Sequence, residues 1–219
     1  SSNAVARKTV ISSFLCPSDS YGAGDVFKPG EEGEGSNDEE TPDATPGSKE
    51  YARSNYPGVF GSEHMGGHDE HASAAGWLMS WVGTVALLSE EDEGLEPGEG
   101  NGIFFAGGAN GKNAVSFRDV TDGLSKTIMI GERDSRLGGS LWIGRGDGLE
   151  SGMSRVVGVG EHVFNSGDPH FEDFFSSHPG GVSFVFADGH VAFLSNGMAE
   201  SLFQSLSTRA GGEVVNGTF

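Results

Sequence analysis

The sequence predicts an α+β fold in a single domain over residues 1–219, built on an antiparallel β-sheet with short helices and long acidic loops. The length of 219 residues is that of one ordinary domain. Glycine supplies 37 residues without a fixed period, which indicates many tight turns, because glycine adopts backbone angles that other residues avoid. Few segments carry apolar residues at helical spacing, so strands and loops should predominate.

The N-terminal segment TVISSFLCPSD, residues 9–19, is apolar at first and is predicted to form a strand or an extended arm that ends at Pro17. It contains the single cysteine of the chain, Cys16, so no internal disulfide can form. We expect Cys16 to be a small buried side chain. A reactive thiol and an intermolecular bridge are the alternatives.

Two segments, residues 21–50 and 89–102, are rich in glycine, proline and acidic residues and are predicted to be solvated loop insertions, with cation binding as the alternative. The formal net charge of −19 argues against nucleic acid and anionic lipid surfaces as partners, since both need clustered basic residues. Between the loops, residues 72–88 carry Trp77 and Trp81 at helical spacing, but interrupting glycines leave their secondary structure open.

The next segments alternate turn and strand patterns. Residues 101–108 predict a short strand, and Ser116 and Asp119 are candidate helix N-caps. KTIMIGE, residues 126–132, predicts a strand, and GSLWIGRG, residues 139–146, is expected to be its neighbour in the sheet.

The best-defined element is a β-hairpin within HPGGVSFVFADGH, residues 178–190. Val182, Phe184 and Phe186 alternate with less apolar residues, Asp188-Gly189 follows, and a second apolar run resumes. A strand, Asp-Gly and a second strand predict a hairpin closed by a type I′ turn.

A short amphipathic helix is predicted after the hairpin. Met198, Leu202 and Leu206 are spaced at i, i+4 and i+8, which places them on one helix face. Gly211 is expected to end this helix.

The histidine and aspartate of the hairpin segment could suggest a hydrolase, with His178 as base and Asp188 as its partner. However, the sequence lacks a G-x-S-x-G nucleophile motif, and Ser176 and Ser177 are only sequence neighbours of His178. We therefore expect no enzymatic activity and no catalytic residues. His178, Asp188 and Gly189 are interpreted as structural, with a metal or ligand role as the alternative.

A second candidate is the histidine cluster of EHMGGHDEH, residues 63–71. His64, His68 and His71 could bind Zn²⁺ or Cu²⁺ if they shared a helix face, but the two glycines between them oppose a helix. A loose surface cluster is the favoured interpretation.

Six segments resemble a known family. They are FLCPSD (14–19), SNYPGVFG (54–61), NGIFF (101–105), RDVTDGLSKTIMIGER (118–133), the pattern His178-X9-Asp188-Gly189, and LSTRAGGEVV (206–215). In this order they resemble the bacterial domain-of-unknown-function family 1559, best known from planctomycetes, which carries an H-X9-DG signature near its C-terminus.

The resemblance implies a type IV pilin-like or pseudopilin-like protein of the cell envelope or extracellular face, with this chain as its globular head. Members typically begin with a prepilin-like leader and a hydrophobic helix, which this chain lacks, so membrane attachment is expected only through that helix. The implied function is that of a structural assembly subunit whose partners are copies of itself or other pilin-like subunits. The alternative is an extracellular module that binds a glycan, peptide or divalent cation, with Trp77, Trp81 and Trp142 able to stack on sugars.

The resemblance also brings Ca²⁺ into consideration, since pseudopilin-type domains commonly hold it in C-terminal loops. The candidate acids are Asp168, Glu172 and Asp173 in one segment and Asp147 and Glu150 in another. Neither segment matches an EF-hand loop. Exposed acids in turns are the favoured interpretation, so no cofactor is established by the sequence, and Ca²⁺ is the candidate.

Overall fold

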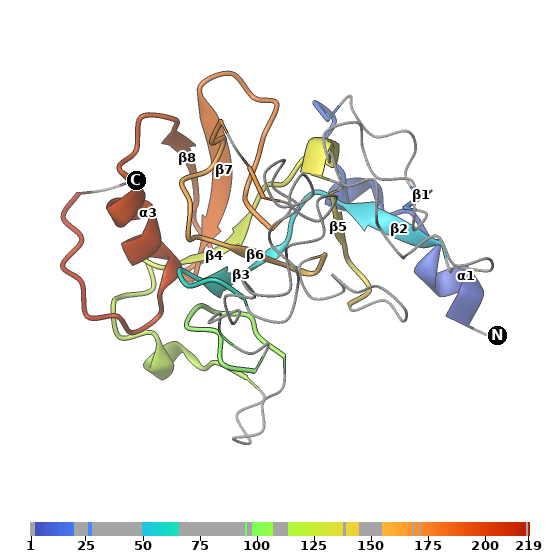
Figure 1. Cartoon of the computed structure of the whole chain (residues 1–219). Helices are drawn as coiled ribbons and strands as arrows, with labels where there is room; N and C mark the ends of the chain where they lie inside the picture. The colour runs from blue at the N-terminus through green and yellow to red at the C-terminus, as the bar shows by residue number, and fades with distance from the viewer. Residues whose placement is uncertain are drawn as a thin grey trace, which may run out of the picture.

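The computed structural model places two β-sheets and short helices along the chain (Figure 1). It describes residues 3–19, 26–27, 50–65, 95, 98–106, 114–137, 139–144, 155–167, 169–170, 172–217 and 219. Most of the two acidic segments and all of residues 72–88, including Trp77 and Trp81, lie outside these residues. No helix in the described part of the chain has the length and apolar character needed to cross a membrane.

The larger sheet has five strands in the order β6-β3-β4-β7-β8. All neighbouring pairs are antiparallel except β3 and β6, which are parallel. The predicted α+β class is consistent with this mixed sheet and its few helices. The strands are β3 (Gly58–Gly61), β4 (Ile128–Gly131), β6 (Val157–Val159), β7 (Gly181–Phe186) and β8 (Val191–Ser195).

The smaller sheet has the order β1-β2-β5 and consists of β1 (Val26–Phe27), β2 (Tyr51–Ser54) and β5 (Ser140–Leu141). The strand predicted from residues 126–132 is confirmed as β4. The prediction that residues 139–146 form the neighbouring strand of β4 is wrong. β5 pairs with β2, and the Ser140 hydroxyl donates to the Ser54 carbonyl over 2.8 Å. Between β4 and β5 the chain turns through the 3₁₀-helix η3 (Ser135–Leu137), which carries it away from the larger sheet.

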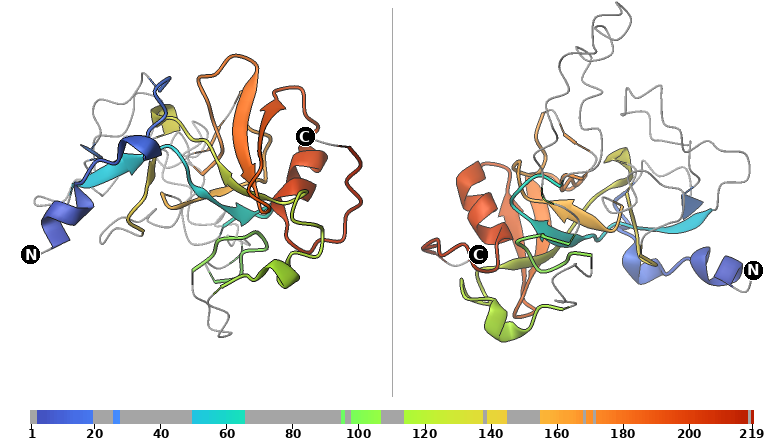
Figure 2. Two further views of the ribbon diagram at one scale, coloured as in Figure 1. Left: turned by 180° about the vertical axis from the view of Figure 1, so that it is seen from behind. Right: turned by 60° about the horizontal axis from the view of Figure 1, so that its bottom comes forward.

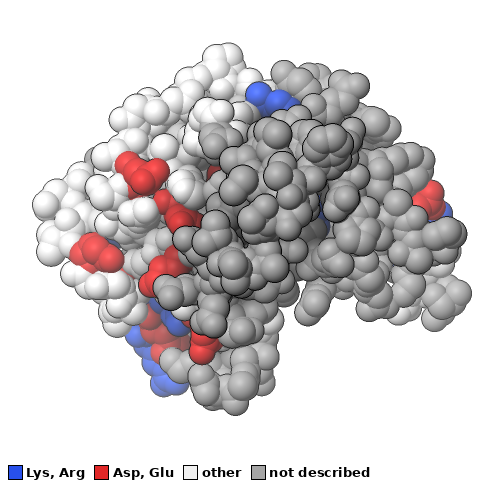
Figure 3. Space-filling model, in the orientation of Figure 1, with Lys and Arg blue, Asp and Glu red and all other residues white. Residues whose placement is uncertain are grey.

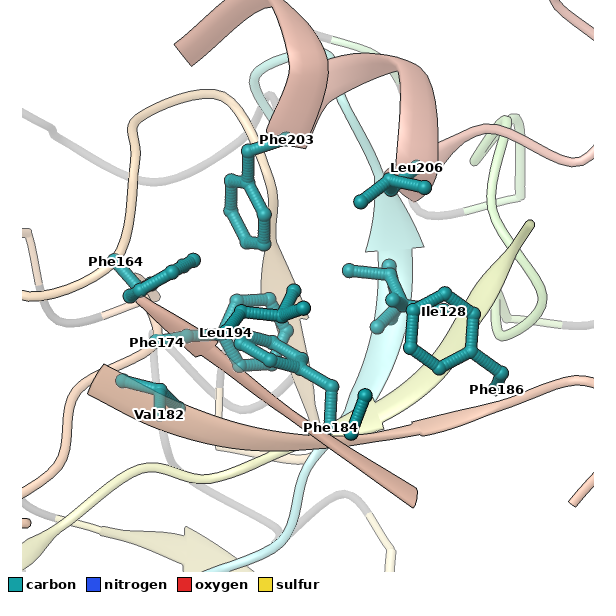
Figure 4. Packing of buried hydrophobic residues seen from close by; sticks show 11 residues of the cluster. Ile128, Phe164, Phe174, Val182, Phe184, Phe186, Leu194, Phe203 and Leu206 are labelled. Carbon is teal, nitrogen blue, oxygen red and sulfur yellow. The ribbon is translucent and has the colours of Figure 1, made fainter. Parts of the chain in front are cut away.

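The core lies between the larger sheet and helix α3 (Glu200–Ser207), and Figure 2 shows this helix against the sheet from two further sides. Phe203 and Leu206 of α3 face Phe184 and other side chains of the sheet (Figure 4). Phe184 lies 5.4 Å from Phe203 and 5.3 Å from Phe164 between ring centroids. The fully buried members are Val59, Ile128, Phe164, Phe174, Val182, Phe184, Phe186, Leu194, Phe203 and Leu206.

The predicted hairpin is confirmed as β7 and β8, with Val182, Phe184 and Phe186 facing the core. Its turn differs from the prediction. Gly189 has a φ of +91°, but Asp188 is not among the positive-φ residues, so a type I′ turn is wrong. The Gly189 amide donates to the Phe186 carbonyl and the Phe186 amide to the His190 carbonyl, both over 2.9 Å. This three-residue loop is a type I turn followed by a left-handed glycine, which spares Asp188 an unfavourable φ.

The predicted amphipathic helix is confirmed as α3, with different ends. Met198 lies before it, Phe203 and Leu206 are its fully buried apolar residues, and Leu202 is partly buried. The helix ends at Ser207, because Thr208 is already extended with φ −93° and ψ 149°, so Gly211 does not end it.

The N-terminal segment predicted as a strand or an extended arm forms no strand; its backbone is extended at Ile11 and Leu15, on either side of a short 3₁₀-helix. The N-terminal part consists of α1 (Asn3–Arg7) and the 3₁₀-helix η1 (Ser12–Phe14), followed by Cys16, which is buried as expected. This segment is joined to the chain just after β2 by the Asn55 backbone amide, which donates to the Phe14 carbonyl.

Two local predictions in the middle of the chain have different outcomes. Ser116 caps the 3₁₀-helix η2 (Phe117–Asp119), and Asp119 completes the cap by accepting from the Ser116 amide and hydroxyl. The described residues 101–106 form no strand, although the amides of Ile103 and Phe104 both donate to the Val59 carbonyl of β3. Because both bonds converge on one carbonyl, no regular ladder can form.

Candidate functional site

The chain immediately after β4 lies beside the segment that leads into β7. Arg133 and Phe175 form a parallel bridge, and the Phe175 amide donates to the Glu132 carbonyl over 3.0 Å. Adjacent side chains on extended backbone point to opposite sides. Glu132 accordingly faces His178, whereas Arg133 faces the backbone of Glu172 and Asp173. Two groups of possible metal ligands result.

The first group, here called the His–Asp cluster, consists of His162, His170 and Asp173. One ligand atom of each lies within 4.8 Å of the others. His162 Nδ1 is 3.8 Å from Asp173 Oδ1, and the two imidazole rings meet edge to face with centroids 4.8 Å apart. Glu172 borders the cluster, with its Oε1 atom 3.8 Å from His170 Nδ1.

Burial in the His–Asp cluster leaves polar atoms without hydrogen bonds. Asp173 is 1% exposed and Glu172 is 2% exposed. Asp173 Oδ2 accepts from the His170 amide over 2.9 Å, but its other oxygen has no hydrogen-bond partner. The buried atoms without hydrogen bonds are His162 Nδ1, His170 Nδ1, Glu172 Oε2 and Asp173 Oδ1. The contacts of His162 Nδ1 with Asp173 Oδ1 and of His170 Nδ1 with Glu172 Oε1, both at 3.8 Å, are longer than hydrogen bonds and offset only part of the cost of burying these atoms.

The charges within the His–Asp cluster change the pKa of His162. The Asp173 carboxylate raises the pKa of His162 to about 9, although burial of the ring opposes this rise. A metal ion needs an unprotonated imidazole nitrogen, so binding here would release a proton. The half-exposed rings of His162 and His170 leave the cluster accessible from solvent.

Arg133 holds the acidic side of the cluster in place. Its guanidinium donates to the carbonyls of Asp173, over 2.8 Å, Val157, over 3.2 Å, and Glu172. Complete burial lowers the pKa of Arg133 to about 9, partly offset by the Glu172 carboxylate. The side chain is therefore still charged at neutral pH and fixes the backbone that carries both acids.

The second group, here called the Cys–Glu–His cluster, joins residues that are distant in the sequence. His178 Nε2 lies 3.5 Å from Cys16 Sγ and 3.4 Å from Glu132 Oε1. Cys16 and Glu132 are buried, and the His178 side chain is 34% exposed. Ligand atoms of all three residues lie within 4.8 Å of one another.

The Cys–Glu–His cluster is unsuited to a catalytic thiol. In a nucleophilic triad the base contacts nucleophile and acid through opposite ring nitrogens, whereas His178 presents Nε2 to both Cys16 and Glu132. Burial, followed by hydrogen bonding to Glu132, raises the pKa of the Cys16 thiol. Burial and the neighbouring Cys16 and Glu132 also raise the pKa of Tyr56 to about 12. Both groups are therefore protonated at neutral pH.

A serine triad is not formed either among the described residues at His178. The Ser177 hydroxyl donates to Asp134 over 2.8 Å, and the Ser176 hydroxyl accepts from the His178 amide over 3.1 Å. Asp188 lies beyond the far end of β7 and bonds His190 Nδ1 over 2.6 Å, so it is not the partner of His178.

The other predicted ligands are separated. His64 Nδ1 lies 3.4 Å from Glu161 and belongs to neither cluster. Glu172 and Asp173 are buried, so the expectation that they are exposed acids is wrong. Their backbone is drawn inward by Arg133, which the local sequence does not reveal. His68, His71, Asp147, Glu150 and Asp168 lie outside the described residues.

Sequence reasoning missed His162, His170, Cys16 and Glu132 as partners of a site. A weak signal existed for His170, which precedes Asp173 by three residues in SGDPHFEDFF. No local signal joins Cys16 to His178, because 162 residues separate them.

Residues 1–200 match the family model SBP_bac_10, described as a protein of unknown function (DUF1559). The chain belongs to the DUF1559 family. No curated protein and no solved structure gave a significant match.

In this DUF1559 member, four of the segments that carried the resemblance meet at the Cys–Glu–His cluster. Asn55 joins them: its Oδ1 atom accepts from the Cys16 amide over 2.8 Å, and its Nδ2 atom donates to the Arg133 carbonyl over 2.9 Å. Nδ2 also donates to Asp19 Oδ2 over 2.7 Å, and this oxygen accepts from the Ser135 amide and hydroxyl. The motifs therefore build one buried polar network.

Proposed function

We propose that this DUF1559-family chain is a non-catalytic module that binds a divalent metal ion through the His–Asp cluster, in the cell envelope or outside the cell. The observation that carries the proposal is a set of four buried polar atoms without hydrogen bonds, contributed by His162, His170, Glu172 and Asp173. A cation held between His162, His170 and Asp173, whose ligand atoms lie within 4.8 Å of one another, would give the buried atoms of these three residues a partner, with Glu172 beside them.

The donor types favour Zn²⁺ or a similar transition metal. Imidazole nitrogen together with carboxylate oxygen suits Zn²⁺, Cu²⁺ and Ni²⁺. Ca²⁺ instead takes about six to eight oxygen ligands, and two of the three residues in this cluster are histidines. Ca²⁺ binding by Glu172 and Asp173, the alternative that the sequence left open, is tested in the same experiment.

The surface charge is compatible with cation capture. The net charge is −19, and the face in Figure 3 carries several acidic groups among uncharged residues. A negative surface raises the local concentration of cations and lowers that of anions. The geometry of the Cys–Glu–His cluster supports the non-catalytic part of the proposal, because its thiol is protonated and shares one ring nitrogen with Glu132.

Thermal unfolding of the chelator-treated protein tests the proposal, with Zn²⁺ and Ca²⁺ added separately. A ligand at about 100 times its Kd stabilises by about 2.7 kcal/mol, which for a domain of this size raises Tm by roughly 5–10 °C. We expect this rise with Zn²⁺, and we expect its loss in the double variant His162→Ala/His170→Ala. His190→Ala, an imidazole of similar exposure outside both clusters, is the matched control.

A Zn²⁺ shift that survives in the double variant would place the ion elsewhere and reject the His–Asp cluster. A shift with Ca²⁺ alone that is lost in Asp173→Asn would replace the transition metal by calcium at the same acids. No shift with either ion would overturn the proposal.

A second candidate function is that of a structural subunit in a pilin-like or pseudopilin-like envelope or extracellular assembly. It is favoured by β8, which is an edge strand of the larger sheet and exposes Val191 and Phe193 by 68% and 53%. An edge strand with an apolar outer face can add a strand from another copy or from a related subunit. Such pairing would form best at raised salt, which screens the acidic surface.

Light scattering during size-exclusion chromatography at low and high salt tests the assembly role. We expect association that grows with protein and salt concentration and disappears in Phe193→Lys, whereas Phe117→Lys, which changes an exposed phenylalanine away from β8, leaves it intact. A monomer at all concentrations would reject self-association through β8.

A further inference from the structure

The Cys–Glu–His cluster has the composition of a second, different metal site. It combines sulfur, nitrogen and oxygen donors, and it is separate from the His–Asp cluster. Its three residues come from the N-terminal segment, the end of β4 and the entry to β7, and Asn55 fixes the backbone of the first two.

The spacing of its ligand atoms matches that of a tetrahedral ion. With Zn–S of about 2.3 Å and Zn–N or Zn–O of about 2.0–2.1 Å, a tetrahedral angle separates sulfur from nitrogen by about 3.6 Å and nitrogen from oxygen by about 3.4 Å. The corresponding distances at His178 Nε2 are 3.5 Å to Cys16 Sγ and 3.4 Å to Glu132 Oε1. Two of the three ligand–ligand distances therefore have the length that a tetrahedral ion requires, and the third, between Cys16 and Glu132, lies within 4.8 Å.

The same three side chains can be joined by protons or by a cation. In the metal-free protein the thiol proton of Cys16 and a proton on His178 Nε2 can both be directed at Glu132, whereas a cation between the three atoms would replace both protons and interact with every donor atom. Glu132 is only 2% exposed, and a buried carboxylate needs a positive partner. His178 is the one residue of the three that reaches solvent to a substantial extent, which gives an ion a route inward.

We propose that Cys16, Glu132 and His178 form a second site, for a thiolate-bound transition-metal ion of the zinc class. Three protein ligands leave one tetrahedral position for water or for a ligand atom. On binding, the Cys16 thiol loses its proton to solvent and sulfur becomes a metal ligand, with no change in oxidation state. The proposal is independent of metal binding at the His–Asp cluster.

Titration of the metal-free, reduced protein with Co²⁺ tests this site. Sulfur bound to Co²⁺ gives a charge-transfer band in the near ultraviolet that imidazole and carboxylate ligands do not give. We expect the wild-type band to saturate, to disappear in Cys16→Ser, and to be lost at the same cobalt concentration in His178→Ala and Glu132→Gln. His190→Ala should retain it in full.

Bound cobalt is counted in the same samples by elemental analysis, which separates the two proposals. If the His162→Ala/His170→Ala variant loses one equivalent of cobalt but keeps the band, both sites are supported. If bound cobalt gives no sulfur band in the folded wild type, the Cys–Glu–His site is overturned while the His–Asp cluster can stand. An undiminished band in both His178→Ala and Glu132→Gln also overturns it, and these variants decide the question even if Cys16→Ser does not fold.

Discussion

Two regions that meet at strand β4 are buried to the same degree but held by different forces. Ile128 at the start of β4 packs into the aromatic core with Phe184 and Phe203. Residues 132–135, just after β4, are also buried, yet all four are charged or polar. Together with Asn55 we call these four residues the polar junction.

The difference lies in what each side chain requires of its neighbours. Dispersion and removal from water stabilise the core, and both depend on volume and area more than on direction. In the polar junction every donor must meet an acceptor, because an unpaired buried polar group costs about 1–3 kcal/mol. The free energy of unfolding should therefore fall when side-chain volume is removed from the core, and when a hydrogen-bond partner is removed from the polar junction.

Removing a core side chain should have the largest effect. Phe203 is fully buried and contacts Phe164, Phe174 and Phe184 ring to ring. We expect Phe203→Ala to lower the free energy of unfolding by about 3–5 kcal/mol, through lost transfer energy and a residual cavity. Urea unfolding followed by circular dichroism measures this, and Phe203→Leu, which retains most of the volume, should cost less than half as much. Equal losses in both variants would contradict the volume argument.

Removing one partner from the polar junction should have an intermediate effect. Asn55 bonds the Cys16 amide, the Arg133 carbonyl and Asp19, although little apolar area depends on it. We expect Asn55→Ala to cost about 2–3 kcal/mol, because buried backbone groups lose their partners. The same urea experiment measures it. Asn55→Asp should also destabilise despite its nearly equal volume, since it replaces the amide donors with oxygen; full stability of this variant would contradict the directional argument.

Disrupting the exposed pair Asp188–His190 should have the smallest effect on stability, and it serves as a reference for the core and the polar junction. At the hairpin turn, Asp188 accepts from the His190 amide and contacts the His190 ring, and these bonds lower the pKa of Asp188. Because the folded-state pKa lies below the unfolded one, the stabilisation is present above the unfolded pKa and is lost as the pH falls through the folded pKa.

We therefore expect the carboxyl resonance of Asp188 to titrate below the usual aspartate range, and His190→Ala to move its midpoint upward. The difference in Tm between wild type and Asp188→Asn should be small at neutral pH and should vanish at acidic pH. A midpoint that does not respond to His190→Ala would show that the backbone amide of residue 190, which the variant keeps, lowers the pKa of Asp188 without help from the imidazole ring.

The contrast also explains which features the sequence could predict. The hairpin and α3 follow from apolar residues at periods of two and about four, which record burial on one face. The segment Glu132–Ser135 has no apolar periodicity that would predict its burial, and charged residues ordinarily lie on the surface. Its burial depends on partners far along the chain: Arg133 bonds the Asp173 carbonyl 40 residues away, and Ser135 bonds Asp19 116 residues away.

The same reason limits prediction of the candidate sites. Asp173 could be selected as a carboxylate in a cation-binding segment, but its burial depends on Arg133, and its partner His162 lies on the preceding loop. His178 could be selected from a motif, but neither Cys16 nor Glu132 is near it in sequence. The turn at Asp188-Gly189 was anticipated as a turn, while its type depended on how β7 and β8 align.

The contact between Cys16 and His178 also constrains the order in which the chain folds. It closes a span of 162 residues. Contacts of such sequence separation form slowly, because the loop entropy is lost before the contact contributes. The β7–β8 hairpin, by contrast, is local and can form early. We therefore expect the Cys16–His178 contact to form after the hairpin, so that protection of the thiol from a labelling reagent would report on a late step of folding.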